Sequence, residues 1–202
     1  MKRLIIVLSC LVLAVSVSAQ PRRVEHNVQL GLGVFSYGGD LSQYFGVGHL
    51  AGRVSYGADI CGSGHWSVMP EIGAKIFWEG IFALGAAGAD FDTLFYLDFT
   101  LSGRYHTDSG IILGLGPMLS FTWWPDHYYV DANPGDSLNR RAKNKPFLVS
   151  LRPSISFDVG PRWRLGIEGE LGLMNAKVQH MDINRPFFGR LHALRFFAAW
   201  HF

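Results

Sequence analysis

The chain has 202 residues, of which 49% are hydrophobic and only 17% are charged. Its 18 Lys and Arg residues nearly balance its 16 Asp and Glu residues, for a net charge of +2. That balance gives no electrostatic support for binding nucleic acid, which is therefore not expected as a partner.

The first residues have the pattern of a secretory signal peptide. Lys2 and Arg3 precede a long apolar run, and small residues around Ala19 suit cleavage after that position. We therefore predict a signal peptide over 1–19 and a single domain over 20–202. Removing 1–19 removes Lys2 and Arg3 and no acidic residue. The mature domain then has 16 basic and 16 acidic residues, since 18 minus 2 is 16, and is expected to be electrically neutral.

The chain has two cysteines, Cys10 and Cys61, and their positions limit which lipid attachment and which disulfide are possible. An alternative interpretation makes Cys10 the lipid-bearing residue of a lipoprotein, although the apolar run before it is short. After cleavage only Cys61 remains, so no intramolecular disulfide is expected. The mature chain also lacks an apolar run of the ~18 residues that a membrane-spanning helix needs.

Beyond the leader, apolar residues recur at every second position in eight segments, which is the period of a β-strand. One face of these segments holds no Asp, Glu, Lys or Arg at 48 positions, where the overall charged fraction predicts about eight. A charge facing the middle of a bilayer costs ~2–4 kcal/mol, so this face is expected to meet lipid. The segments span 28–34, 50–60, 66–78, 95–105, 111–123, 147–159, 163–173 and 194–202.

Short and long links alternate between these segments, as periplasmic turns and extracellular loops do in outer-membrane barrels. We therefore predict an all-β fold: an eight-stranded antiparallel transmembrane β-barrel with up-and-down order, monomeric, in a bacterial outer membrane. Asp108 is expected on the periplasmic side, and Tyr128 and Arg141 outside the cell. The short links are 61–65, 106–110 and 160–162, and the long ones are 38–48, 79–92, 125–145 and 175–187.

Two further features concern the outward face. Pro70, Pro117 and Pro153 lie on it, and because proline cannot donate to a ladder, we expect a bulge at each. Aromatic residues gather near the strand ends and are expected to form two interfacial girdles. These are Trp66, Tyr105, Trp163, Trp200 and Phe202 at one end, and Trp78, Phe121, Trp123 and Phe147 at the other.

Several segments resemble the PorT-like family of small outer-membrane barrels of Bacteroidota. They are WSVMPEIG from Trp66, YLDFTL from Tyr96 with Gly116-Pro117 after it, and LGLMNA from Leu171. The resemblance implies an eight-stranded barrel inserted by the barrel-assembly machinery, which would recognise the terminal aromatics Trp200 and Phe202. It implies no catalytic residue and no cofactor. One family member is associated with protein secretion, which makes a secretion or transport accessory the alternative function.

The inward faces carry the first candidate site, a set of four acids and four bases at middle depth. One hypothesis is a gated pore or a proton-coupled site. The other, which we favour, is a plug of salt bridges in a lumen that side chains fill. Glu168 and Glu170 share a face and are expected to pair with arginines rather than with each other. The eight residues are Arg53, Glu71, Lys75, Asp98, Arg152, Glu168, Glu170 and Arg195.

The long loops carry the remaining candidates. A lipid-modifying enzyme would need an exposed His with a Ser, but no Ser lies near His192 on the last strand, and His127 and His180 fall in loops. No His-x-His spacing indicates a metal. The link 125–145 is rich in basic residues that would face lipopolysaccharide, or it is simply a tolerant loop; the link segment 81–89 is unusually apolar. The leading function is therefore a non-enzymatic structural or surface-interaction protein.

Overall fold

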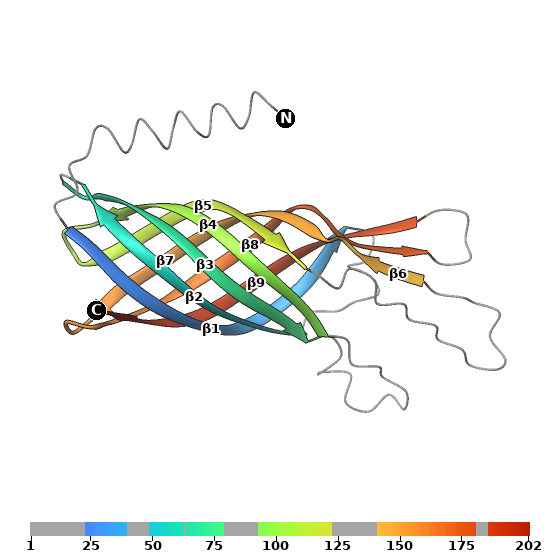
Figure 1. The fold of residues 1–202 in the computed structure, drawn as a ribbon, viewed down its shortest axis with the longest axis horizontal. Coiled ribbons are helices and arrows are strands. Elements are labelled where there is room, and N and C mark those ends of the chain that lie inside the picture. The colour runs from blue at the N-terminus through green and yellow to red at the C-terminus, as the bar shows by residue number, and fades with distance from the viewer. Residues whose placement is uncertain (1–22, 40–48, 63, 79–92, 123–140, 181–185) are drawn as a thin grey trace, which may run out of the picture.

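The computed structural model describes residues 23–39, 49–62, 64–78, 93–122, 141–180 and 186–202. No helix among them is long and apolar enough to cross a membrane. Nine antiparallel strands make up nearly all of this part of the chain (Figure 1). They are β1 (Arg23–Gly39), β2 (His49–Cys61), β3 (Trp66–Trp78), β4 (Thr93–His106), β5 (Ile111–Phe121), β6 (Arg141–Asn144), β7 (Phe147–Val159), β8 (Trp163–His180) and β9 (Pro186–His201).

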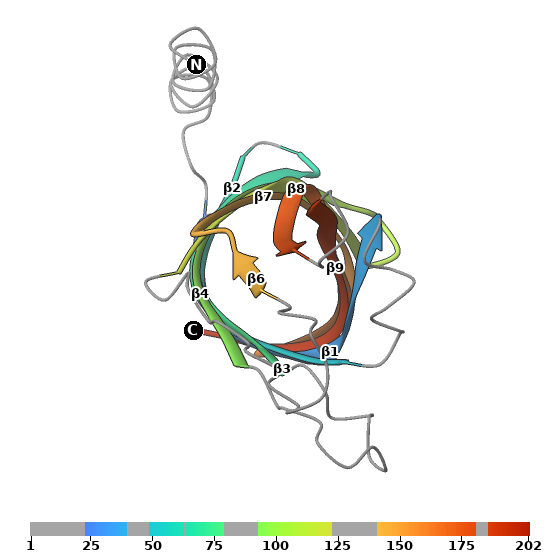
Figure 2. The ribbon, with the colours of Figure 1, turned by 90° about the vertical axis from the view of Figure 1, so that its right-hand side faces the viewer.

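Eight of these strands close into a barrel, and the predicted fold class is confirmed. The order around the wall is β8-β7-β5-β4-β3-β2-β1-β9, and β9 pairs back onto β8. The first and last strands meet along their length, from Asn27 opposite His201 to Gly39 opposite Gly189. Viewed from the end where β5 and β8 terminate, the wall is a complete ring (Figure 2). We call this the long-loop end, and the opposite end the short-turn end.

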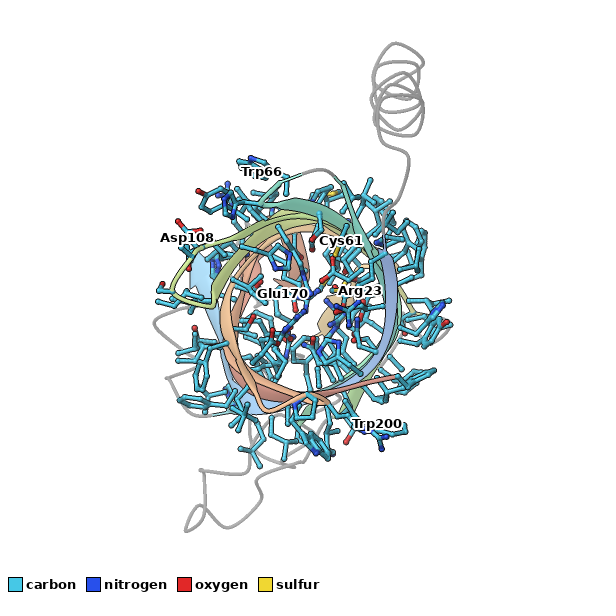
Figure 3. The ribbon with its side chains drawn as sticks, turned by 90° about the vertical axis from the view of Figure 1, so that its left-hand side faces the viewer. Arg23, Cys61, Trp66, Asp108, Glu170 and Trp200 are labelled. Atoms are coloured by element: carbon cyan, nitrogen blue, oxygen red, sulfur yellow. The ribbon has the colours of Figure 1, made fainter. Side chains whose placement is uncertain are left out.

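Side chains alternate between the two faces of the wall, as the period of two requires. Leu30 and Phe196 point outward and are 58% and 66% exposed, whereas their neighbours Gln29 and Phe197 point inward and are buried. From the short-turn end, Trp66 and Trp200 lie outside the ring and Glu170 lies inside it (Figure 3). An apolar exterior around a polar interior reverses the polarity of a water-soluble barrel and suits lipid as the surrounding solvent.

At the long-loop end the structure differs from the predicted loops. The short strand β6 lies within the expected loop 125–145 and pairs with β8, from Arg141 opposite His180 to Asn144 opposite Lys177. β8 itself continues into the expected loop 175–187 as far as His180, with register shifts against β9 near Asn175. We call β6 and the ends of β8 and β9 the strand extension. β6 and the end of β8 are too polar to show the lipid-facing alternation, so sequence periodicity ends before these strands do.

The three outward prolines do not sit at bulges, so that expectation was wrong. The register on either side of each proline is unchanged, and the ladder is merely interrupted toward one neighbour. Pro70 lacks a bridge to β2, Pro117 to β4 and Pro153 to β8. Both backbone polar groups of a residue in an antiparallel strand face the same neighbour. A missing N–H therefore breaks pairing on one side only.

Several sequence predictions fall outside the described residues. These include the signal peptide, whose boundary therefore stays a prediction, one predicted girdle aromatic and two loop residues. They concern 1–19, the apolar segment 81–89, Trp123, His127 and Tyr128.

Candidate functional site

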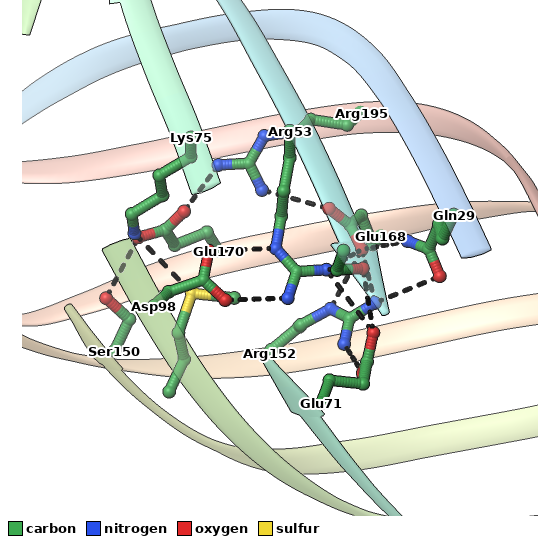
Figure 4. A network of polar contacts seen from close by, with 12 residues as sticks. Gln29, Arg53, Glu71, Lys75, Asp98, Ser150, Arg152, Glu168, Glu170 and Arg195 are labelled. Atoms are coloured by element: carbon green, nitrogen blue, oxygen red, sulfur yellow. Dashed lines mark hydrogen bonds and ion pairs between the residues drawn. The ribbon is translucent and has the colours of Figure 1, made fainter. Parts of the chain in front are cut away.

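The structure places all eight predicted lumen charges at middle depth in the barrel, each no more than 2% exposed. They come from β2, β3, β4, β7, β8 and β9, and β1 adds Gln29 (Figure 4). Inward parity explains why each of them points into the lumen. The closure of the wall decides which of these side chains contact each other. Several partners lie on strands that are not neighbours and meet only across the closed lumen.

Arg53 and Asp98 form the best-aligned pair of the network. Arg53 Nη2 lies 2.7 Å from Asp98 Oδ1, and Arg53 Nε lies 3.1 Å from Oδ2. This two-point geometry gives the strongest kind of ion pair available to a carboxylate. The same guanidinium lies 3.5 Å from Glu71 and 3.6 Å from Glu168, so it links three acids.

Glu168 is the centre of the network. Arg152 donates to it from Nε at 2.8 Å and contacts it from Nη2 at 2.5 Å, while Arg195 Nη1 lies 3.0 Å from its other oxygen. The Gln29 amide donates a further hydrogen bond at 2.8 Å. Arg152 also donates to Glu71, from β7 to β3 across the lumen. Both oxygens of Glu168 are therefore satisfied without an added proton.

Glu170 has its own cations, so it does not share a proton with Glu168. Lys75 donates to Glu170, Arg195 Nη2 lies 2.5 Å from it, and the Ser150 hydroxyl donates at 3.1 Å. Four acids and four bases meet in this layer, and each has at least one partner of opposite sign. Such pairing is what makes buried charges tolerable, since an unpartnered one carries an uncompensated desolvation penalty.

An apolar cap covers the network on the long-loop side and was not expected from the sequence. Phe77 packs on Phe35 with ring centroids 4.9 Å apart, and Tyr96 lies 6.1 Å away. The Lys75 ammonium lies 5.5 Å from the Phe77 ring, and the Arg195 guanidinium lies 5.7 Å from the same ring. The cap comprises Phe35, Tyr37, Ala51, Phe77, Leu94, Tyr96, Leu148, Ala176, Leu191 and Ala193.

A second polar layer lies toward the short-turn end. Asp59 Oδ2 accepts from Arg104 at 3.0 Å and from Arg164 at 3.3 Å. Arg164 also donates to Asp158 at 2.7 Å. These two acids and two bases have the inward parity of their strands, but sequence parity does not show their mutual contacts.

At the rim of this layer, three residues with metal-binding side chains converge. One ligand atom each from Asp59, Cys61 and His106 lies within 4.8 Å of the others. Ser67 Oγ and His106 Nε2 are 2.8 Å apart. Cys61 lies within the ring of strands when the barrel is viewed from this end (Figure 3). Sequence spacing missed this cluster because its members come from two different strands.

The outer wall carries one further arrangement that the last strand alone did not show. Ser36 on β1 is the direct cross-strand partner of His192 on β9. Both line a groove of about 660 Å³ on the wall, together with Pro153 and Gly169. Among the described residues, no hydrogen bond joins the Ser36 hydroxyl to the His192 ring.

The terminal aromatics lie at the short-turn end. Trp200 and Phe202 are exposed, with ring centroids 5.3 Å apart. The Phe202 ring also stacks on His26, and its backbone N–H donates to the His26 carbonyl at 3.0 Å. The last residue is thus held against the first strand.

Comparison with known proteins identifies the fold and no family. No family model matches the sequence, and no curated protein matches it. The fold is similar to that of Neisserial surface protein A, at 15% identity over 88% of this chain and 97% of that one, with a TM-score of 0.53. It is also similar to a major outer membrane protein from Thermus thermophilus, at 12% identity over 90% and 100%, with a TM-score of 0.51. At these identities the likeness shows a shared fold alone, and the PorT-like assignment stays a prediction.

Proposed function

We propose that this chain is a non-enzymatic integral protein of a bacterial outer membrane, with a sealed lumen and its interactions made outside the cell. The observation that carries the proposal is the closed, charge-balanced interior beneath the apolar cap. The absence of charge at the outward positions of the eight predicted strand segments supports a membrane location, and a solved barrel of the same fold is described as a major outer membrane protein.

Two stacked layers support the proposal of a sealed lumen. Eight paired charges occupy its middle, and Phe35, Phe77 and Tyr96 pack above them, all nearly without solvent exposure. An ion crossing this barrel would have to displace the pairs and the cap together. A ligand passing through the barrel would meet the same obstacle, so this architecture favours a structural or surface role over transport.

Conductance tests the seal directly. Protein inserted into a planar bilayer should pass little current, and Arg152→Met should lower stability without opening a stable ion path. An open conductance in the unaltered protein, with Arg152→Met changing only ion selectivity, would show a pore and end the proposal.

The strand extension is the part of the described structure best placed for contact with other molecules at the cell surface. β6 carries Arg141 and Lys143, and Lys145 follows it, while the outer leaflet presents anionic lipopolysaccharide. Replacing all three by Gln should weaken binding to lipopolysaccharide-containing vesicles, and more so at low salt. Unchanged binding would remove this segment from the proposal.

The resemblance to the PorT-like family motivates a second candidate, an accessory component of a secretion or transport system. Such a component needs a periplasmic or membrane partner. Cross-linking in intact cells should then recover the same partner through residues of the short-turn end, such as Asp108→Cys. If only lipid and the assembly machinery are recovered, the first proposal stands.

The Ser36–His192 pair on the outer wall favours a third, lipid-modifying candidate. Its apolar groove suits an acyl chain, and a serine activated by a histidine is a common nucleophile for ester cleavage. The activating hydrogen bond has not formed in this structure. If lipid A extracted from expressing cells is unaltered relative to a Ser36→Ala variant, this candidate is eliminated.

A further inference from the structure

We propose that Asp59, Cys61 and His106 form a transition-metal site, best suited to Zn²⁺, at the short-turn rim of the barrel. One oxygen, one sulfur and one nitrogen ligand converge there within 4.8 Å of one another. Bonds of ~2.0–2.3 Å to zinc place tetrahedral ligands closer together than this. Rotations of the Cys61 and His106 side chains at the ends of their strands would close the difference.

The state of Asp59 is the independent observation that points to a ligand. Its side chain is fully buried, and Oδ2 takes both arginine contacts. The other oxygen, Oδ1, is buried and accepts no hydrogen bond of standard geometry among the described residues, although the Ser67 hydroxyl lies beside the carboxylate while it contacts His106. A buried carboxylate oxygen without a partner is costly and is rare in native structures. A cation bound at Oδ1 would supply what is missing.

The surrounding contacts are those of a supported metal ligand set. Arg104 and Arg164 hold the Asp59 carboxylate, and the Ser67 hydroxyl holds the His106 ring through Nε2. Outer contacts of this kind orient metal ligands and are typical of built sites. With Nε2 occupied by Ser67, the Nδ1 lone pair remains for the metal.

The charges around the site admit a divalent ion. Asp59 and Asp158 already balance Arg104 and Arg164, so the cluster is neutral before the metal binds. Binding releases the Cys61 thiol proton and adds one thiolate, which leaves a single positive charge. A water or hydroxide in the fourth position would complete a three-ligand site with one exchangeable position. Cys61 is partly exposed, which gives the ion access from the short-turn end.

Cobalt(II) is the probe, because it takes zinc sites and reports thiolate ligation by charge-transfer absorption. Barrel purified from membranes and stripped of metal with a chelator should bind one equivalent of Co²⁺ and develop the charge-transfer absorption. Added Zn²⁺ should displace the bound Co²⁺ and remove the absorption. Cys61→Ser should abolish the absorption, and His106→Gln should weaken cobalt binding at least tenfold. His201→Gln, which changes a second rim histidine, should behave like the unaltered protein.

Folding is checked for every variant by heat-dependent gel mobility, so loss of signal cannot reflect an unfolded barrel. Cys61→Ser and His106→Gln leave the Asp59 ion pairs intact and are therefore preferred over Asp59→Asn. Absence of thiolate-to-cobalt absorption in the folded, unaltered protein would overturn the proposal. So would absorption of equal strength and affinity in His106→Gln, since a bare thiolate adduct would then explain it.

Discussion

The Arg152 guanidinium on β7 donates to the Glu71 carboxylate on β3, across the lumen and over a sequence separation of 81 residues. Arg152 also holds Glu168 on β8. One side chain thus ties three strands that are not all neighbours in the wall. The pair couples the two sides of the barrel through its interior.

Arg152→Met should therefore destabilise the barrel strongly, because it leaves Glu71 and Glu168 short of a cation in a dry interior. We expect a loss of about 3–5 kcal/mol if the site stays enclosed, and less if water enters. Unfolding by urea in lipid vesicles measures it. Arg23→Met is the matched control, since Arg23 pairs with Glu25 while 74% exposed, and it should change stability by less than ~1 kcal/mol. Equal losses would show that the interior pairs do not carry the stability assigned to them.

A double-mutant cycle isolates the pair itself. Arg152→Met combined with Glu71→Gln should cost less than the sum of the two single changes, because the second removes a charge that the first left without its partner. Additive losses would mean that the contact between Arg152 and Glu71 contributes no coupling.

The apolar cap predicts a second kind of sensitivity. Phe77→Ala should cost about 3–5 kcal/mol, because the ring is fully buried between Phe35, Tyr96 and two cations. Phe99→Ala removes the same ring from the outer face, where Phe99 is 50% exposed to lipid, and should cost much less. The same urea titration compares them, and a larger loss at Phe99 would contradict the buried cap.

On the outer face, introducing a charged side chain should lower the stability of the barrel, whereas introducing a larger apolar side chain should not. Leu115 points outward from β5 and is 53% exposed. Leu115→Arg should lower the stability of the inserted barrel by ~2–4 kcal/mol if the residue lies near mid-bilayer. Leu115→Phe keeps the site apolar and should be nearly neutral. A harmless arginine would show that this face does not meet lipid.

Orientation is tested by labelling from outside the cell. In a background without Cys61, a membrane-impermeant maleimide should modify Arg141→Cys on intact cells. Asp108→Cys should react only after the outer membrane is opened, although its side chain is 97% exposed and lies in a short turn. Labelling of Asp108→Cys on intact cells would reverse the topology.

The C-terminal aromatic is expected to act during insertion more than in the finished barrel. Phe202→Ala should slow the appearance of folded protein in the membrane while leaving urea unfolding nearly unchanged, because the ring is 60% exposed. Phe196→Ala removes an equally outward ring from β9, which Phe202 follows, and should not slow assembly. Pulse-chase labelling with heat-dependent gel mobility measures the rate of assembly of each variant. If Phe202→Ala assembled as fast as Phe196→Ala, Phe202 would not be an insertion signal.

The sequence alone determined the wall of this barrel. A charged side chain that faces lipid is unfavourable, so apolar residues recur at every second position of each strand segment. The alternate residues from Leu113 to Phe121, none of which is charged, are an example. The alternation of short and long links then specified the order and the closure. The same signal stops where the strands leave the lipid, so the sequence predicts loops where β6 and the end of β8 lie.

Only the tertiary structure decided which interior groups meet. Gln29 reaches Glu168 over 139 positions, and Asp59 on β2 meets His106 on β4, because closure brings inward side chains of distant strands into one narrow space. No periodicity along the chain encodes such pairings, since the interior accepts any side chain whose charge and volume its neighbours can match. Phe35 and Phe77 of the apolar cap also point inward, although they are not polar. An inward-facing position can therefore hold an apolar residue where several such residues pack together.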